Sequence, residues 1–137
     1  SRAAPTSRAH FPLAPDRNTI PCASNLFARS ANPASNSANE ALSSAWCRCL
    51  DTARLAFGRV TAYAPLDSFF ASRATEPRQT AALRERVRAW QGPGTLALVT
   101  HQVNITALTG EVPAMGEALV LAPGGAAGFA VVGRIAF

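Results

Sequence analysis

Apolar runs and their spacing predict five strands after residue 38. Short runs rich in aliphatic residues cover Glu40–Ser44, Val60–Tyr63 and Leu96–Thr100. Two further runs, Glu117–Ala122 and Phe129–Ile135, are separated by a Pro-Gly-Gly turn. This arrangement predicts a β-hairpin in the last part of the chain.

Three helices are predicted between these strands. Cys47–Phe57 carries apolar residues at helical spacing and stops at Gly58. A second helix starts at Thr75, with a proline in its first turn, and runs to about Trp90. A third follows His101. Because strands and helices alternate, we expect a three-layer α/β/α fold with a mainly parallel sheet and a C-terminal β-hairpin.

Residues 1–38 show neither the period of a strand nor that of a helix. They are rich in Ser, Ala, Asn, Pro and Arg, and Asp16 is the only acidic residue before Glu40. This composition is typical of an organellar transit peptide, and also of a segment that never evolved to fold, such as a shifted reading frame. Five prolines would interrupt a presequence helix, which favours the second interpretation and a cytoplasmic location. We therefore expect an atypical, poorly packed segment over 1–38 and a domain over 39–137.

Charge and hydropathy exclude several classes of partner. The chain has a net charge of +5, and its basic residues are all arginine, but they form no cluster interleaved with aromatic residues. We therefore do not expect a nucleic-acid partner. No apolar run approaches the roughly 18 residues needed to span a bilayer. Cys22, Cys47 and Cys49 lack the spacing of zinc ligands, so we interpret them as free thiols and expect no metal.

Two junctions between a strand and a helix concentrate polar residues. The first is Ser43-Ser44-Ala45-Trp46-Cys47-Arg48, and the second is Thr100-His101-Gln102. In α/β folds, ligands bind at the carboxyl ends of parallel strands, where helix N-termini offer N–H groups and a positive dipole end to an anion. An arginine adds a planar fork for phosphate oxygens, and a histidine adds a further donor, a nucleophile or a proton carrier. The two junctions together predict a phosphate site.

The same residues resemble a known family. SSAWCRCLDTARLAFG resembles the S-x-x-x-R-x-x-x-T-A block of the histidine phosphatase superfamily, which has the phosphoglycerate mutase-like fold. LVTHQVNITALTG, followed by GEALVL at Gly116–Leu121, resembles the block that contains the second histidine of that superfamily. The resemblance covers residues 39–137, and the ordered pair of blocks is more specific than either alone.

The resemblance implies a metal-independent phosphohydrolase that needs no cofactor. Arg48 matches the arginine that holds the transferred phosphoryl group, and His101 matches the second histidine, which binds the same group without being the nucleophile. Asp67 is the nearest match to the general acid, and Glu76 is a second candidate. The reaction would transfer a phosphoryl group from a phosphorylated small molecule to a histidine and then to water.

One block of the family is not found. The family opens with an interior strand ending in Arg-His-Gly, whose histidine becomes phosphorylated; this sequence has no Arg-His-Gly, and Arg8-Ala9-His10 is the closest approach. Loss of an interior strand would expose two ladders of unpaired backbone groups. The alternative function is therefore an inactive truncated or frame-shifted relative that at most binds a phosphate-like anion.

The site residues also have purely structural interpretations. A histidine at a strand end, such as His101, is commonly hydrogen-bonded for structural reasons. Arg48 in the first turn of a helix is commonly a solvated charge, and Asp67 would also serve to cap a turn. Asn104-Ile105-Thr106 matches a glycosylation sequon, which we interpret as accidental because it falls beside the predicted pocket.

Overall fold

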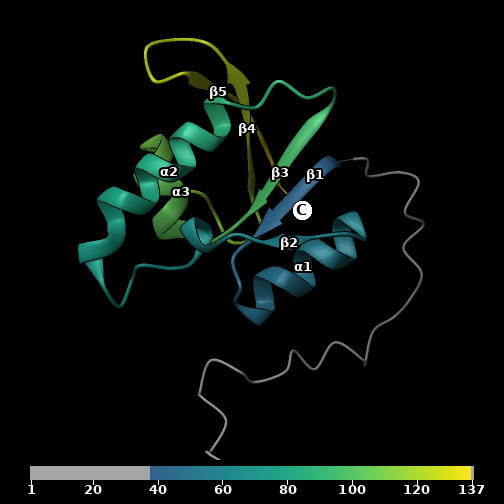
Figure 1. Cartoon of the computed structure of the whole chain (residues 1–137), viewed down its shortest axis with the longest axis vertical. Coiled ribbons are helices and arrows are strands. Elements are labelled where there is room, and N and C mark those ends of the chain that lie inside the picture. The colour runs from purple at the N-terminus through teal and green to yellow at the C-terminus, as the bar shows by residue number, and fades with distance from the viewer. Residues whose placement is uncertain (1–37, 137) are drawn as a thin grey trace, which may run out of the picture.

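The computed structural model describes residues 38–136, and residues 1–37 and 137 lie outside the described part (Figure 1). The expected poor packing of residues 1–38 therefore falls almost wholly outside it. In chain order the helices and strands are β1 (Ala38–Ser43), α1 (Cys47–Phe57), β2 (Thr61–Ala62), α2 (Glu76–Arg88), β3 (Thr95–Val99), α3 (Gln102–Thr109), β4 (Ala118–Pro123) and β5 (Phe129–Ile135).

The first three strands form a parallel sheet in the order β2-β1-β3. Leu42 of β1 lies opposite Thr61 on one side and Leu98 on the other. The predicted α/β class is confirmed. β2 is shorter than predicted because Pro65, which lacks an N–H, forms part of the 3₁₀ turn Ala64–Leu66 directly after it.

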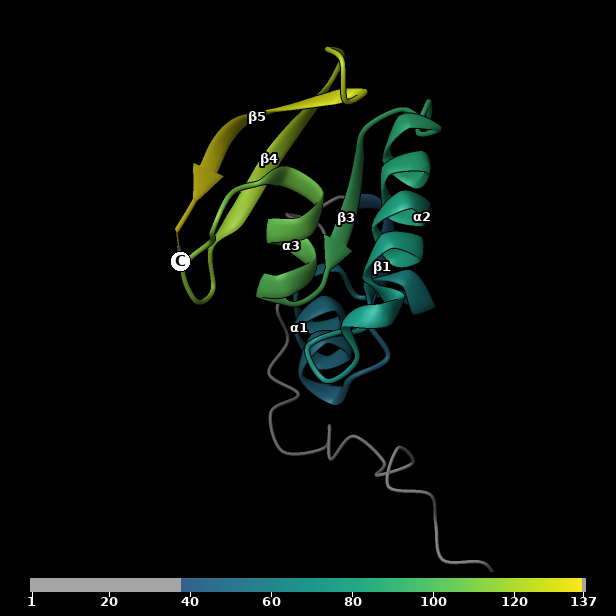
Figure 2. The same cartoon turned by 90° about the vertical axis from the view of Figure 1, so that its left-hand side faces the viewer.

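Helices lie on both faces of this sheet. α1 lies on one side, and α2 lies with α3 on the other (Figures 1 and 2). The crossovers β1-α1-β2 and β2-α2-β3 run in opposite directions across the sheet, and right-handed crossovers then place their helices on opposite faces. Between the sheet and α2, the core is built on Leu42, Leu66 and Leu83. None of the helices among residues 38–136 is both long and apolar enough for a membrane span.

Glycines end the two helices that follow β1 and β3. Gly58 has a φ of 77° and its N–H donates to the carbonyl of Arg54, which closes α1. Gly110 has a φ of 79° and closes α3 through the carbonyl of Thr106. Other residues rarely adopt a positive φ, so these glycines explain why both helices stop there.

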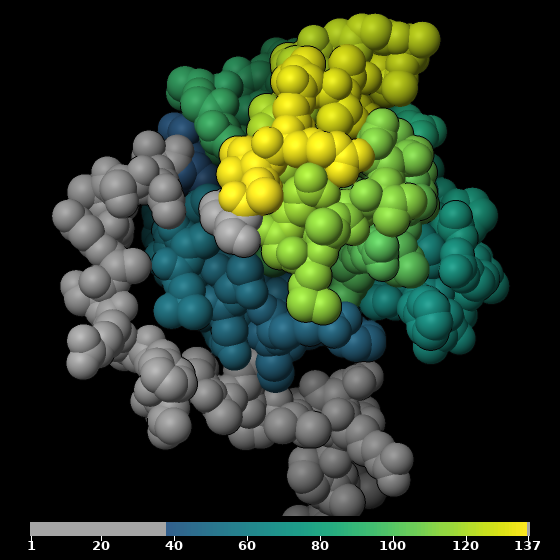
Figure 3. Space-filling model, turned by 180° about the vertical axis from the view of Figure 1, so that it is seen from behind, coloured from purple at the N-terminus to yellow at the C-terminus, as the bar shows by residue number. Residues whose placement is uncertain are grey.

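The last two strands form a separate antiparallel hairpin. Figure 3 shows the hairpin (yellow) beside the segment that joins α3 to β4 (light green). Phe129 is buried at its turn end, whereas Val132 and Ile135 are exposed. Within residues 38–136, β3 pairs only with β1 and β4 pairs only with β5. Each of these two strands therefore keeps one open edge within the described residues.

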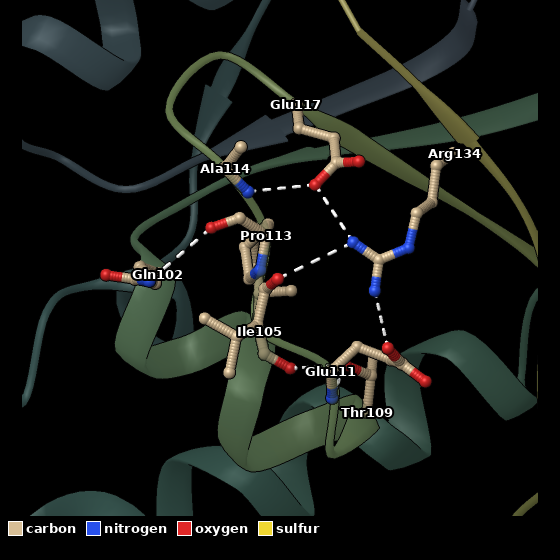
Figure 4. A network of polar contacts seen from close by, with 9 residues as sticks. Gln102, Ile105, Thr109, Glu111, Pro113, Ala114, Glu117 and Arg134 are labelled. Carbon is tan, nitrogen blue, oxygen red and sulfur yellow. Dashed lines mark hydrogen bonds and ion pairs between the residues drawn. The ribbon is translucent and has the colours of Figure 1, made fainter.

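An arginine ties the hairpin to the loop before it. Arg134 of β5 donates to the carboxylate of Glu117 at 3.0 Å and to that of Glu111 at 2.5 Å (Figure 4). The Glu117 carboxylate also accepts the N–H of Ala114 at 2.8 Å. We call Arg134, Glu111 and Glu117 the Arg134 cluster. It holds the loop over residues 111–117 against the start of the hairpin.

Candidate phosphate-binding site

The two predicted junctions meet at the carboxyl end of the parallel sheet. Ser44 follows β1, and its N–H donates to the carbonyl of Val99 at the end of β3, at 2.9 Å. This bond brings the start of α1 next to the start of α3. Arg48 projects from the first turn of α1, and His101 immediately precedes α3.

A chain of hydrogen bonds crosses this edge. Nη2 of Arg48 donates to Nδ1 of His101 at 2.9 Å, because a guanidinium can only donate. The neutral ring then carries its proton on Nε2 and donates it to Oγ of Ser44 at 2.9 Å. Ser44 in turn donates to Oδ1 of Asp67 at 2.9 Å, and the N–H of Ala45 donates to the same oxygen at 2.8 Å. We call Arg48, His101, Ser44 and Asp67 the Arg48 chain.

Asp67 is held in place through the backbone of its own loop. Its carbonyl accepts from Nε2 of Gln79 on α2 at 2.7 Å and from Nδ2 of Asn104 on α3 at 2.9 Å. The neighbouring carbonyl of Leu66 accepts from the hydroxyl of Thr100 at 2.6 Å. Side chains from α2, from α3 and from the residue that follows β3 therefore fix the loop that presents the Asp67 carboxylate to Ser44.

The imidazole of His101 is buried and neutral. Burial is the main cause that lowers its pKa, and the positive charge of Arg48 lowers it further, whereas the charge of Asp67 acts in the opposite direction. A fall from an ordinary value of about 6.5 leaves the ring uncharged at pH 7. Arg48 therefore faces a neutral partner, and its positive charge is not cancelled by the ring.

Cys49 lies next to His101 of the Arg48 chain. Its sulfur is 3.7 Å from Nε2 of His101 and 3.8 Å from the carbonyl of Thr100. Burial raises the pKa of the Cys49 thiol, so it is a poor source of thiolate.

The two cysteines of the C-x-C pair have different bonding states. Cys49 is a free thiol, as predicted, but Cys47 is disulfide-bonded, so the prediction of three free thiols is wrong for Cys47. Residues two apart on a helix face different directions, and Cys47 is half-buried while Cys49 is buried. Cys22 and His10 lie outside the described residues.

Trp46 forms the outer side of the site. Its ring makes an edge-to-face contact with the ring of His101, with centroids 4.9 Å apart. The guanidinium carbon of Arg48 lies 5.3 Å from the centroid of the Trp46 ring. The tryptophan is 49% exposed, although it touches both of the predicted phosphate ligands.

The starts of α1 and α3 suit an anion. Within residues 38–136, neither helix has a side chain that caps its N-terminus, and neither has an acidic residue in its first turn. Arg48 makes no ion pair with a carboxylate of the described part. Backbone N–H groups and a positive charge that no carboxylate cancels therefore converge on one edge.

The predicted site residues are only partly brought together. Arg48 and His101 are in direct contact, and Asp67 joins them through Ser44. Glu76, the second candidate for the general acid, instead pairs with Arg73 at 3.6 Å, and no contact joins it to the Arg48 chain among the described residues. The 3₁₀ turn Arg73–Thr75, directly before α2, brings Arg73 next to Glu76, which explains the pairing.

Two positioning residues were missed from the sequence. Gln79 lies near the start of α2, where no feature of the sequence marks it as a site residue. Asn104 lies three residues after His101, and its sequence context indicates only a glycosylation sequon. It is 1% exposed and its Nδ2 is bonded within the protein, which agrees with an accidental sequon. Its buried Oδ1 has no partner among the described residues.

The geometry differs from that of a Ser-His-Asp triad. In a triad the carboxylate orients the histidine, which in turn removes a proton from the serine. Here Asp67 contacts Ser44, and His101 donates to that serine while its Nδ1 faces a cation. No group of three or more potential metal ligands occurs within residues 38–136. The arrangement is suited to binding negative charge.

Comparison with family models, curated proteins and solved structures finds no match to this chain. The chemical interpretation of the site therefore depends on its own geometry and on the two sequence blocks.

Proposed function

We propose that the carboxyl end of the sheet binds the phosphoryl group of a phosphorylated small molecule, in the manner of a histidine phosphatase. The observation that carries this proposal is the contact between Arg48 and His101 at the uncapped starts of two helices. Arg48 uses one N–H on the imidazole and can offer others to phosphate oxygens. The resemblance of the two sequence blocks assigns the same two residues to this task.

Binding a phosphate dianion would change the protonation of His101. In the free protein Nδ1 accepts from Arg48, so it cannot donate to an anion. A dianion between the two side chains favours the imidazolium, which donates from Nδ1 to the phosphate while Nε2 keeps its bond to Ser44. The site is therefore expected to take up a proton as it binds phosphate near pH 7.

Turnover needs a nucleophile that the described residues do not offer. Nε2 of His101 carries a proton held by Ser44, and the pKa of Cys49 is raised by burial. The Oδ1 atom of Asp67 already accepts two hydrogen bonds, so this atom is not free to deliver a proton to a leaving group. We propose phosphate binding with little turnover as the main function. An active phosphohydrolase is the second candidate, and it requires a phosphate-accepting histidine outside residues 38–136.

Calorimetric titration with methylphosphonate, which is not hydrolysed, tests the binding proposal. Arg48→Ala removes hydrogen bonds to a charged group, and we expect the affinity to fall by about 10- to 100-fold. Arg54→Ala is the matched control, because Arg54 is on the same helix and pairs only at the surface with Asp51, at 3.7 Å. In buffers of different ionisation enthalpy, the titrations should also show proton uptake that is absent in His101→Gln. Equal affinity in wild type and Arg48→Ala would refute the proposal.

Hydrolysis of a generic aryl phosphate separates the two candidates. We expect the 137-residue chain to show little or no rate above background, because electrostatic stabilisation alone supplies no nucleophile. Robust turnover that His10→Ala abolishes would establish the phosphohydrolase, with His10 completing the site. Turnover abolished only by His101→Ala would make His101 the nucleophile and overturn the roles implied by the family.

A further inference from the structure

Trp46 is placed unlike a residue that serves only to fill the core. A buried tryptophan removes a large apolar area from water, but 49% of Trp46 remains exposed. Its backbone is nevertheless fixed on both sides: the N–H donates to Oγ of Ser44 at 3.2 Å, and the carbonyl accepts from the N–H groups of Cys49 and Leu50. The backbone of Trp46 is therefore fixed, and its ring is an aromatic surface that is about half exposed to solvent.

The ring also lies at the right place to meet a ligand. It contacts His101 with centroids 4.9 Å apart and lies 5.3 Å from the guanidinium carbon of Arg48. A phosphorus atom held by these two side chains is thus next to the indole. The organic group of a bound phosphate ester extends from the site either past this ring or on the opposite side.

We propose that Trp46 is an aromatic subsite of the phosphate site, and that the preferred ligand is an aryl phosphomonoester. This inference rests on the proposed function. The guanidinium of Arg48 covers part of the indole, and the exposed remainder offers a π surface for stacking or for an edge-to-face contact with a second aromatic ring. A ring joined to phosphorus through a single oxygen reaches Trp46, whereas a nucleobase is carried further away by its ribose.

The test compares benzylphosphonate, in which a CH₂ group takes the place of the ester oxygen, with methylphosphonate by calorimetric titration. In the wild-type chain we expect benzylphosphonate to bind about 10-fold more tightly, as is typical of one stacked ring. Trp46→Leu should bring this ratio close to one, and Trp46→Phe should restore most of it. Trp90→Leu is the matched control, because Trp90 also lies beside an arginine, with the guanidinium carbon of Arg86 5.8 Å from its ring. This pair lies at the C-terminal end of α2.

The outcomes separate this proposal from the one on which it rests. If neither phosphonate binds the wild-type chain, the proposed function fails and the subsite fails with it. If both bind equally well, the phosphate site stands and the aromatic subsite is overturned. If Trp46→Leu weakens both ligands by the same factor, Trp46 only positions His101 and Arg48, and the proposal is wrong. Tighter binding of adenosine monophosphate than of phenyl phosphate would overturn the choice of an aryl ester.

Discussion

Two exposed arginines of this domain have opposite surroundings. Arg134 reaches two carboxylates, those of Glu111 and Glu117. Arg48 makes its hydrogen bond to the neutral ring of His101 and lies beside the indole of Trp46. The first arginine is neutralised by its partners, and the second keeps its positive charge.

In our proposal, this difference separates a structural arginine from one that binds an anion. In the Arg134 cluster, the guanidinium donates to the carboxylates of Glu111 and Glu117 and so joins the loop before β4 to β5 (Figure 4). In the Arg48 chain, the carboxylate of Asp67 is three hydrogen bonds away, with Ser44 and His101 between it and the cation. An intervening neutral group keeps the site attractive to an anion, which a direct ion pair would prevent.

The largest expected effect on stability comes from breaking the inner end of the Arg48 chain. Asp67→Ala removes the acceptor of two hydrogen bonds and leaves the hydroxyl hydrogen of the buried Ser44 without its acceptor. We expect the free energy of unfolding to fall by about 2–3 kcal/mol. Urea denaturation measures it, and Glu111→Ala, which removes an exposed carboxylate from the other cluster, is the control. If the free energy of unfolding falls as little as in the control, the Arg48 chain of hydrogen bonds contributes little to folding.

A smaller effect is expected from the outer cluster. Arg134→Ala removes an exposed ion pair with Glu111 and a partly buried one with Glu117, which together should stabilise the fold by about 1 kcal/mol. The affinity for methylphosphonate should not change, because Arg134 has no contact with the Arg48 chain among the described residues. Thermal unfolding and phosphonate titration of the same variant check both statements. Loss of phosphonate affinity in this variant would contradict the division into a structural and a binding arginine.

The smallest expected effect is confined to a narrow pH range. The pKa of His101 is lowered in the folded state, so below about pH 6.5 the unfolded chain binds more protons at this residue. The stabilisation that the neutral His101 gives to the folded state is fully present above that pH. It is lost as the pH falls towards the folded-state pKa. Urea denaturation between pH 5 and 7.5, in buffer without phosphate, should show a shallower decline for His101→Gln. Identical profiles would mean that the histidine is not neutral in the folded protein.

Local signals in the sequence were sufficient for most of the secondary structure. The predicted helix over Cys47–Phe57 has the observed bounds, because Gly58 supplies the positive φ that ends it. The topology also follows, since parallel strands joined by helices bring their carboxyl ends to one edge. That rule is sufficient to place Arg48 near His101, and the two side chains are indeed in contact.

The sequence by itself therefore determined the α/β class, the bounds of α1 and the meeting of the two junctions, because each depends on local propensity or on the handedness of crossovers. The tertiary structure decided the partners. Gln79 and Asn104 hold Asp67 from two different helices, and Glu76 turns to Arg73. Such choices depend on side-chain distances across elements far apart in the chain, which no spacing along the sequence encodes.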